Sequence, residues 1–194
     1  MGLPCCFIRL SGCPFHCSYC DTEFAREEKG EDISIPAVLA RLNDYSCRLV
    51  EVTGGEPLAQ KDTPELLRAL EASGRSVLLE TSGHLPLDEV PASTAIVMDI
   101  KTPGSGRAGF HPGNLARLGP RDAVKFVICG REDFEWAMRT AAEHDLASRM
   151  TVFFSPAWGL VAPRDLAEWI LDSGLAVRLQ IPLHKLLWGD QRGT

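Results

Sequence analysis

The sequence predicts an α/β fold in which parallel strands form a partial, open β/α barrel. Apolar runs alternate along the chain with segments in which apolar residues recur at helical spacing. Most of these runs are continuous, which is typical of strands covered on both faces. The strand–helix order favours right-handed crossovers, and the lack of a second apolar cluster in the sequence indicates one curved sheet. We therefore expect a single, compact domain over residues 1–194.

Seven segments are predicted to form strands and four to form helices. The strands are 5–10, 49–53, 77–81, 95–100, 123–129, 151–155 and 177–181. The helices are 36–45, 64–73, 134–144 and 164–173. Pro64 at a first helical position, with Thr63 as its N-cap, and the stop residues Gly74 and Gly174 support two of them. Segments 25–32 and 102–120 are expected to be rim loops.

Composition excludes several classes of function. A net charge of −6 without a basic block argues against nucleic-acid binding and against a polybasic membrane anchor. The sequence contains no apolar run long enough for a transmembrane helix and no secretion signal. An odd number of cysteines, seven, argues against a disulfide framework and favours a reducing, cytoplasmic environment. Outside the motif described below, Cys5, Cys6, Cys47 and Cys129 are expected to be buried as small hydrophobes.

Polar clusters follow almost every predicted strand at the same end. In parallel α/β sheets, ligands bind at the carboxyl ends of the strands. The segments at these ends are the cysteine-rich loop 13–22 and residues 53–57, 80–83, 99–101, 155–158 and 183–185. Loops decorated by chance would be scattered over both ends, so this edge of the sheet is the predicted site.

Three cysteines, Cys13, Cys17 and Cys20, are spaced C-x3-C-x2-C directly after the first strand. Three thiolates at this spacing can hold a cubane iron–sulfur cluster and leave one iron without a protein ligand. A structural zinc site would need a fourth ligand, either His16 or Cys6. A redox pair of Cys17 and Cys20 is less favoured, because such a motif normally opens a helix and needs no third thiol.

The cysteine loop and the segment Gly54-Gly55-Glu56-Pro57 resemble motifs of the radical S-adenosylmethionine superfamily. The resemblance implies a [4Fe-4S] cluster whose open iron is chelated by the amino and carboxylate groups of S-adenosylmethionine. It places Tyr19 near the adenine, and the backbone and carboxylate of the Gly-Gly-Glu motif at the methionine ammonium. Glycines suit a backbone that approaches a ligand closely.

Further motifs resemble the 7-carboxy-7-deazaguanine synthase family over nearly the whole chain, from Gly2 to Gly193. These motifs are residues 7–13, 20–22, 52–58, 80–83, 99–101, 183–185 and 188–189. The resemblance implies a carbon–nitrogen lyase of queuosine and deazapurine biosynthesis. It would convert 6-carboxy-5,6,7,8-tetrahydropterin to 7-carboxy-7-deazaguanine with release of ammonia. A 5′-deoxyadenosyl radical would abstract the hydrogen at the pterin C6. The resemblance also implies a small reduced flavoprotein as electron donor and a homodimer.

The same resemblance assigns roles to individual residues. Arg9 would bind the substrate carboxylate, a bidentate task suited to guanidinium, although an exposed charged residue on a strand is the alternative. Thr22 would ligate Mg²⁺, although by itself it suggests a helix N-cap. Thr53 and His184 would touch substrate, the alternative for His184 being a structural histidine at a strand end. The residues expected to line the cofactor are Tyr19, Cys20, Asp21, Gly54, Gly55, Glu56, Asp99, Ile100, Lys101, Ser155, Pro156, Ala157 and Trp158.

Two departures from the family pattern concern substrate contacts. Family members usually carry a strand and a Gly-Glu loop before the equivalent of Gly2, whereas this sequence starts at Met1. Pro182 stands where the family often has glutamine, so that position lacks a side-chain amide and a backbone donor. Two rival functions stay open on the residues alone. One is a small activase that generates a glycyl radical in a partner protein, and the other is a non-enzymatic zinc or iron–sulfur binding module.

Overall fold

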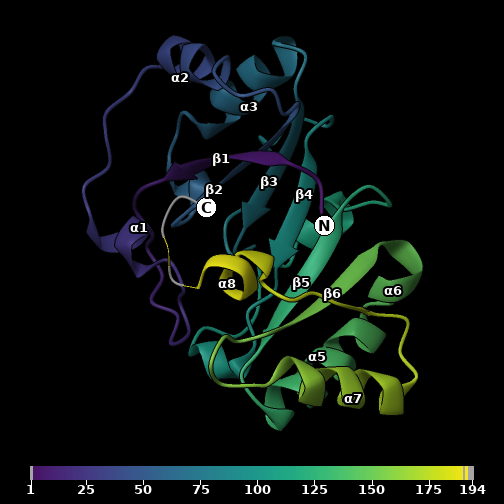
Figure 1. The fold of residues 1–194 in the computed structure, drawn as a ribbon. Coiled ribbons are helices and arrows are strands. Elements are labelled where there is room, and N and C mark those ends of the chain that lie inside the picture. Colours follow the sequence, from purple (N-terminus) through teal and green to yellow (C-terminus); the bar gives the residue numbers. More distant parts are fainter. Residues whose placement is uncertain (1, 190, 192–194) are drawn as a thin grey trace.

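A computed structural model describes residues 2–189 and 191, and the predicted domain and resemblance extend beyond these residues at their ends. Seven parallel strands form one sheet in sequence order (Figure 1). They are β1 (Cys5–Leu10), β2 (Leu49–Gly54), β3 (Ser76–Thr81), β4 (Ala95–Asp99), β5 (Ala123–Ile128), β6 (Thr151–Pro156) and β7 (Arg178–Leu179). Within the described residues β1 pairs only with β2, and β7 only with β6, so the barrel is open. The predicted fold class is confirmed.

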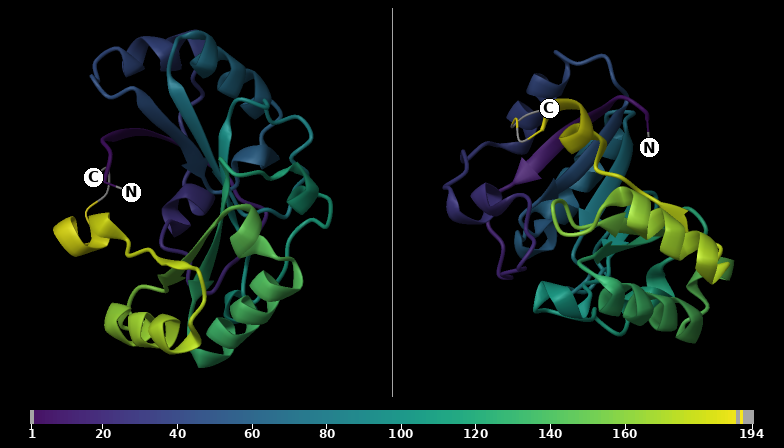
Figure 2. Two further views of the ribbon diagram at one scale, coloured as in Figure 1. Left: turned by 90° about the vertical axis from the view of Figure 1, so that its right-hand side faces the viewer. Right: turned by 60° about the horizontal axis from the view of Figure 1, so that its bottom comes forward.

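Helices surround the outer face of the curved sheet (Figure 2). The α-helices are α1 (Glu23–Glu27), α2 (Ile35–Leu42), α3 (Thr63–Ala72), α4 (Asn114–Arg117), α5 (Arg131–Glu143), α6 (Leu146–Arg149), α7 (Pro163–Ser173) and α8 (Leu183–Trp188). Two short 3-10 helices are η1 (Pro57–Ala59) and η2 (Pro103–Ser105). Contacts join α3 to β3, α5 to β5 and α7 to β6. By contrast, α8 lies between β1 and β7, on the side where the barrel is open (Figures 1 and 2).

The hydrophobic core fills the space between the outer face of the sheet and these helices. Alternate strand residues such as Val52, Leu79 and Phe126 are completely buried there. Phe126 meets Phe154 edge to face, with ring centroids 5.5 Å apart. Such aromatic pairs add to the stabilisation that comes from burying their surface. Packing in the core therefore determines which residues of each strand point toward the helices.

The inner face of the sheet is polar, which corrects the prediction that most strands are apolar on both faces. Side chains along a strand alternate between faces. Glu51 lies between the buried Val50 and Val52, and Lys125 between the buried Val124 and Phe126. These charged side chains therefore share the face opposite the helices. In strands of five or six residues, one or two charged positions interrupt an apolar run too briefly to reveal the alternation.

Several predicted boundaries differ from those observed. Helix α3 has Asp62, not Thr63, at its N-cap, because the Thr63 hydroxyl donates to the Pro57 carbonyl at 2.6 Å. Helix α5 starts three residues earlier than predicted, and α2 ends three residues earlier. Strand β7 is reduced to two residues, and 183–185 opens helix α8 rather than ending a strand. The predicted stop at Gly174 is confirmed, since its φ is +64°.

The prediction that the four cysteines outside the cysteine motif are buried is only partly confirmed. All seven cysteines are free thiols, but only Cys6 is buried, while Cys5, Cys47 and Cys129 are partly exposed. Cys5 and Cys47 lie at the sheet margin and Cys129 follows β5, where packing is incomplete. Within the described part of the chain, no helix is both long and apolar enough to cross a bilayer.

Two leucines provide a matched test of where the core lies. Leu67 of α3 is completely buried, whereas Leu171 of α7 is 78% exposed. We expect Leu67→Ala to lower the free energy of unfolding by about 2–5 kcal/mol, because it removes buried methyl groups and leaves a cavity. Leu171→Ala should change it by no more than about 0.5 kcal/mol. Urea unfolding followed by circular dichroism measures both. Equal effects would contradict the assigned core.

Candidate active site

The loop that carries the three cysteines follows β1 and is held by backbone hydrogen bonds from three directions. We call residues 11–22 the cluster loop. The Gly12 amide donates to the Ala25 carbonyl at 2.7 Å, and the Gly12 carbonyl accepts from the Glu56 amide at 3.0 Å. The Ser18 amide donates to the Ser105 carbonyl at 3.1 Å. The loop is thereby fixed against the carboxyl ends of β2 and β4, as predicted for this edge of the sheet.

The thiols of Cys13, Cys17 and Cys20 are all partly exposed. Within residues 2–189 and 191, no three His, Cys, Asp or Glu side chains are grouped closely enough to hold a single metal ion. In a cubane, each thiolate binds a different iron, so the three sulfurs need not converge on one point. Burial raises the pKa of the Cys17 thiol, while the nearby Lys101 ammonium acts in the opposite direction. Lys101 thus favours the thiolate that a cluster requires.

The turn after β2 packs so closely against the cluster loop that it excludes side chains. A Cβ at Gly55 would lie 2.2 Å from the Gly12 carbonyl oxygen, and one at Gly54 would lie 2.0 Å from that of Leu10. The Gly55 amide donates to the same Leu10 carbonyl at 2.9 Å. These glycines are therefore required by the contact between two loops of the chain. This requirement comes in addition to the predicted approach of the backbone to a ligand.

Glu56 is completely buried and joins the ends of β2 and β3. Its Oε1 accepts from the Thr81 hydroxyl at 2.7 Å and from the Leu58 amide at 3.0 Å. Its Oε2 accepts from the Ser82 amide at 2.8 Å. A buried carboxylate with three donors is well compensated. Both oxygens are engaged by the protein itself, so the contact of Glu56 with a methionine ammonium stays a prediction.

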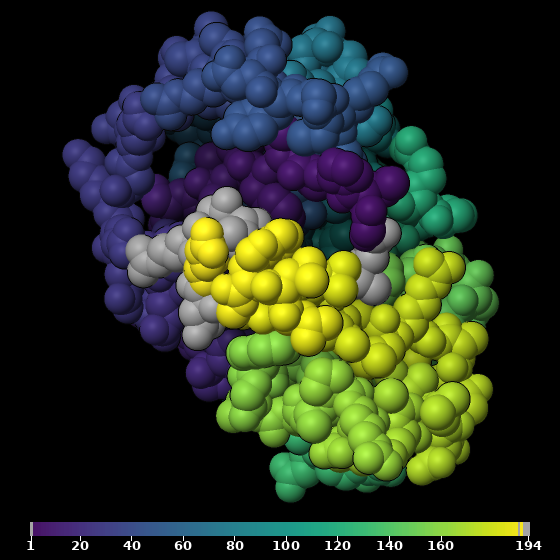
Figure 3. All heavy atoms as spheres, viewed as in Figure 1, coloured from purple at the N-terminus to yellow at the C-terminus, as the bar shows by residue number. Residues whose placement is uncertain are grey.

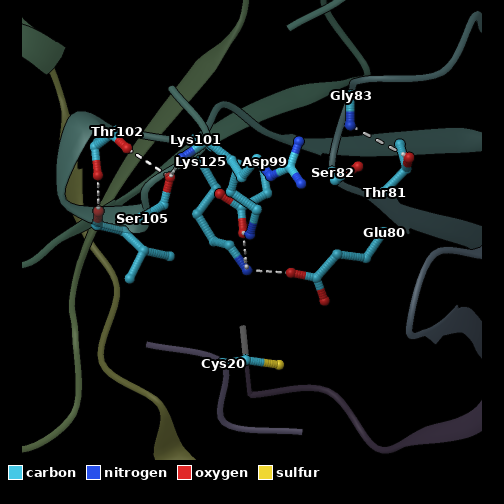
Figure 4. A network of polar contacts seen from close by, with 12 residues as sticks. Cys20, Glu80, Thr81, Ser82, Gly83, Asp99, Lys101, Thr102, Ser105 and Lys125 are labelled. Atoms are coloured by element: carbon cyan, nitrogen blue, oxygen red, sulfur yellow. Dashed lines mark hydrogen bonds and ion pairs between the residues drawn. The ribbon is translucent and has the colours of Figure 1, made fainter. Parts of the chain in front are cut away.

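Five charged side chains form what we call the inner-face cluster: Glu51, Glu80, Asp99, Lys101 and Lys125. Lys125 forms an ion pair with Glu80 and lies 3.8 Å from Asp99 Oδ2. Lys101 Nζ donates to the same Asp99 oxygen at 2.7 Å. Figure 4 shows this chain of charges, with Cys20 facing it from the cluster loop. The inner-face cluster thus lies on the side of the sheet that faces the predicted iron site.

The two glutamates of the inner-face cluster differ in their pKa values and therefore in their protonation. Burial, together with the neighbouring Glu80 carboxylate, raises the pKa of Glu51 to about 8. Burial also opposes ionisation of Glu80. That effect is outweighed by the Lys125 ammonium and by a hydrogen bond from Glu51, which lower the pKa of Glu80 to about 2. At neutral pH the structure therefore favours a protonated Glu51 beside an ionised Glu80.

Unpaired buried polar atoms mark where a bound molecule would be accommodated. Within the described residues, the buried side-chain atoms without a hydrogen-bond partner are Tyr19 Oη, Ser82 Oγ, Asp99 Oδ1 and Gln180 Oε1. Buried polar atoms are normally hydrogen-bonded, so these are donors and acceptors available to a ligand. Tyr19 and Asp99 are among the residues predicted to line the cofactor. Together with the three thiols of the cluster loop, they fit an iron–sulfur cluster bound to a polar amino-acid cofactor.

The structure brings two of the predicted substrate residues together. Arg9 and Thr53 are register partners across β1 and β2, and alternation places both on the inner face. The Arg9 side chain is exposed, with its guanidinium 5.9 Å from the centre of the Phe24 ring. His184 instead lies exposed in the first turn of α8, so its alternative interpretation as a histidine at a strand end is wrong.

Thr22 occupies the N-cap position of α1, but its side chain makes no capping hydrogen bond. The contact found for its hydroxyl is with the Cys20 thiol, at 3.9 Å. Its interpretation as a position before a helix is therefore confirmed, while its capping function is not. Because the hydroxyl does not bond the helix backbone, it is available as an oxygen ligand beside Cys20.

The other predicted cofactor residues lie at strand ends around the same edge. Ser155 and Pro156 end β6 and Ala157 follows them; all three are buried, whereas Trp158 is 44% exposed. Asp99 ends β4, and the completely buried Ile100 follows it. The remaining predicted residue, Asp21, is exposed on the cluster loop.

Glu51 and Lys125 were not predicted as site residues, and Glu80 was predicted only as part of the polar segment 80–83, with no role of its own. Their signal was present in the sequence, since each is a charged residue inside a strand of a sheet whose outer face is covered by helices. Such a residue must face inward or form an ion pair. The alternation of apolar and polar residues extends over too few positions in each strand to reveal them by itself.

Comparison with known proteins agrees with this geometry. The family model described as Radical SAM superfamily matches residues 7–154. The 7-carboxy-7-deazaguanine synthase of Chlorobaculum tepidum is 42% identical over 201 residues, covering 100% of this chain and 90% of that protein. The enzyme of the same name from Koribacter versatilis is 39% identical, covering 96% and 89%. The chain belongs to the Radical SAM superfamily and, within it, to the family of these synthases.

Solved structures support the same assignment. The crystal structure of QueE from Escherichia coli superposes with a TM-score of 0.72 at 26% identity, covering 93% of this chain and 85% of that one. SuiB from Streptococcus suis, bound to S-adenosylmethionine, superposes with a TM-score of 0.65 at 13% identity. It covers 96% of this chain and 53% of SuiB, and this likeness concerns the fold alone.

A methyl group at Gly55 tests the contact between the two loops. We expect Gly55→Ala to displace Gly12 and Cys13, because the new Cβ would lie 2.2 Å from the Gly12 oxygen and 2.8 Å from Cys13 Cβ. The variant should hold less than about half the iron of wild type after anaerobic reconstitution, measured by iron assay and visible absorbance. Gly119→Ala is the control, because nothing lies within 4 Å of its Cβ. Equal iron contents would contradict the steric argument.

The raised pKa of Glu51 predicts a dependence of stability on pH. Between the ordinary carboxyl pKa of about 4.3 and about 8, the folded protein retains a proton that the unfolded chain has lost. Folding therefore loses stability as pH rises through this interval. We expect Glu51→Gln, which cannot ionise, to gain stability relative to wild type between pH 5 and pH 8. Chemical unfolding measures this, with Glu89→Gln at an exposed position as control. A difference independent of pH would refute the assignment.

Proposed function

We propose that the protein is a 7-carboxy-7-deazaguanine synthase acting on 6-carboxy-5,6,7,8-tetrahydropterin with release of ammonia. The observation that carries this proposal is the position of the three-cysteine loop. Cys20 of this loop faces the inner-face cluster, and the same face of the sheet carries the register partners Arg9 and Thr53. The 42% sequence identity to the Chlorobaculum tepidum enzyme, in an alignment that covers the whole chain, supports the same substrate. No side chain is proposed as a catalytic acid or base.

The cluster loop and the strand ends would hold the cofactors. Cys13, Cys17 and Cys20 would ligate the [4Fe-4S] cluster, and Tyr19, Asp99 and the 54–56 turn would contact S-adenosylmethionine. When bound, these groups would supply the abstraction of a hydrogen atom from C6 of the pterin. The chain would orient the pterin and exclude water and other hydrogen donors from the inner face.

Arg9 and Thr53 would position the substrate. A guanidinium can donate two parallel hydrogen bonds to a carboxylate. No acidic side chain within the described residues forms a salt bridge with Arg9 at 4 Å or less, so its charge is free to meet a substrate carboxylate. His184 on α8 would approach the pterin from the open side of the barrel.

Thr22 would provide a protein oxygen to Mg²⁺ shared with the substrate. Magnesium prefers hard oxygen donors and keeps several water ligands, so one hydroxyl and substrate oxygens suit it. The proposal is supported by the hydroxyl of Thr22, which makes no capping hydrogen bond to the backbone of α1. Magnesium would thus join the substrate to the loop that holds the cluster.

We also propose two protein partners and a cellular location. A small reduced flavoprotein would supply electrons, and the chain would form a homodimer in the cytoplasm. Helix α8 supports self-association, because Leu183, Leu186, Leu187 and Trp188 are 42–63% exposed. In Figure 3, α8 and β1 border a hollow in this face of the molecule. An exposed apolar group of this kind marks an interaction surface.

A direct assay tests the proposed function. Anaerobically reconstituted protein with reductant, S-adenosylmethionine, Mg²⁺ and the carboxytetrahydropterin should form the deazapurine acid, detected by mass spectrometry. Cys17→Ala should lose the brown cluster and at least 99% of activity. Formation of 5′-deoxyadenosine irrespective of pterin would exclude this substrate. It would instead favour a rival such as the glycyl-radical activase. A colourless protein indifferent to S-adenosylmethionine would favour the binding module.

Arg9 offers a quantitative test of substrate binding. Losing a charged hydrogen-bond pair costs about 1.5–3 kcal/mol, so Arg9→Gln should raise KM for the pterin roughly 10- to 100-fold. The KM for S-adenosylmethionine should change little, because Arg9 is assigned to the pterin alone. Arg164→Gln, on the exposed surface of α7, is the matched control. An unchanged pterin KM would remove Arg9 from the substrate site.

A further inference from the structure

Two thiols meet at the end of the sheet opposite the cluster loop. Cys6 is the second residue of β1, and Cys47 lies two residues before β2 begins. Their Sγ atoms are 2.7 Å apart, compared with about 2.05 Å in a disulfide bond. Because β1 and β2 are parallel neighbours, with Cys5 opposite Leu49, the thiols meet where both strands begin. Closing the bond requires a shift of less than about 1 Å.

The separation of these sulfurs favours a covalent bond over a metal site. Two thiolates that bind one zinc ion at about 2.3 Å in tetrahedral geometry lie about 3.8 Å apart. A metal would therefore have to force Cys6 and Cys47 further apart. Within the described residues, moreover, these thiols do not belong to a group of three possible ligands.

The two thiols differ in their exposure to solvent. Cys6 is 7% exposed and packs in the core with Leu42 and Val50. Cys47 is partly exposed, so an oxidant can reach it from outside. Arg75 donates to the Cys47 carbonyl at 3.0 Å, which places a guanidinium beside the pair. Burial raises the pKa of the Cys6 thiol to about 11, and this guanidinium acts in the opposite direction. Because Cys47 is the thiol that solvent reaches, it is suited to react first, and Cys6 to complete the bond from the buried side.

We propose that Cys6 and Cys47 form a reversible disulfide when the protein meets a two-electron thiol oxidant such as a peroxide. The Cys47 thiolate attacks the peroxide and becomes a sulfenic acid, releasing the reduced oxygen as water or an alcohol. The Cys6 sulfur then bonds to Cys47 and displaces the hydroxyl as a second molecule of water. Both electrons that leave the sulfurs pass to the peroxide, and a dithiol reductant reverses the step.

The position of the bond gives it a structural consequence. It would close the segment from Cys6 to Cys47, which contains the whole cluster loop, and would fasten β1 to the chain entering β2. A disulfide that closes a loop of this length restricts the unfolded chain. The cluster-bearing segment would thus stay attached to the sheet under oxidising conditions. This inference depends on the thiol geometry and does not depend on the proposed substrate.

Mass spectrometry can test the bond directly. Protein reconstituted with its cluster is treated anaerobically with diamide, which accepts two electrons and two protons from a dithiol. Free thiols are then blocked with N-ethylmaleimide. Trypsin cleaves after Arg9, Arg41 and Arg48, which releases Cys6 in peptide 1–9 and Cys47 in peptide 42–48. We expect these peptides to be joined, and dithiothreitol to separate them. Cys47 that stays fully labelled by maleimide in diamide-treated protein would overturn the proposal.

Variants identify the partner of Cys47, because peptide 1–9 contains Cys5 as well. Cys5→Ser and Cys129→Ser should retain the link, and Cys6→Ser and Cys47→Ser should lose it. If Cys6→Ser does not fold, fragmentation of the linked wild-type peptide between residues 5 and 6 still distinguishes the two thiols. A bond from Cys47 to Cys5 or to a cysteine of the cluster loop would overturn the assignment.

Thermal unfolding tests the structural consequence. Diamide-treated wild type and Cys5→Ser should unfold roughly 5–10 °C higher than the same proteins after dithiothreitol. Cys47→Ser should show no such difference, which controls for other effects of diamide. A confirmed Cys6–Cys47 bond without a change in Tm would refute the claim that it fastens β1 to the sheet.

Discussion

The arrangement of the site depends on the backbone contact between the turn after β2 and the start of the cluster loop. Two amides of that turn, those of Gly55 and Glu56, donate to the carbonyls of Leu10 and Gly12. The close approach of the two segments leaves no space for a Cβ at Gly54 or Gly55. Glu56 then extends the contact sideways to the end of β3. The positions of the three cysteines relative to the sheet are therefore set by main-chain hydrogen bonds and by one buried carboxylate.

The two faces of the sheet have different tasks. The outer face, packed against α3, α5 and α7, supplies the apolar burial that stabilises the domain. The inner face carries ion pairs between neighbouring strand ends. Charges removed from water are costly unless they are paired, and Lys125 satisfies this requirement by contacting both Glu80 and Asp99. The inner face can therefore carry polar groups, because the hydrophobic core lies between the outer face of the sheet and the helices.

Much of this architecture could be predicted from the sequence, because its signals are local. The strands are apolar runs, and the three cysteines are close together, so both were identified from residue spacing alone. Strand alternation was missed, since a single Glu51 or Lys125 in a short apolar segment gives too weak a pattern. Helix α8 was missed because Leu183–Trp188 is only six residues long and comes directly after the predicted strand 177–181 and Pro182. The contact between Cys6 and Cys47 joins residues 41 positions apart and has no local signature.

The roles of single residues depend on their hydrogen-bond partners, which the sequence pattern does not show. Spacing could place Thr22 before a helix, but only the structure shows that its hydroxyl does not bond the helix backbone. The same applies to Glu56, whose three donors come from residues both near to it and distant in the sequence. Hydrogen-bond partners are decided by tertiary packing, so sequence patterns identify candidate groups without showing which of them are already engaged.

The protonation of Glu51 changes the charge balance among the side chains on the inner face of the sheet. With every group ionised, Arg9, Lys101 and Lys125 would balance Glu51, Glu80 and Asp99. Because burial and the Glu80 carboxylate raise the pKa of Glu51 to about 8, these six side chains together carry one excess positive charge at neutral pH. A positive excess attracts anions, both the thiolates of the facing loop and any carboxylate that enters. An acid that stays neutral thus leaves this group of side chains cationic in a protein whose net charge is −6.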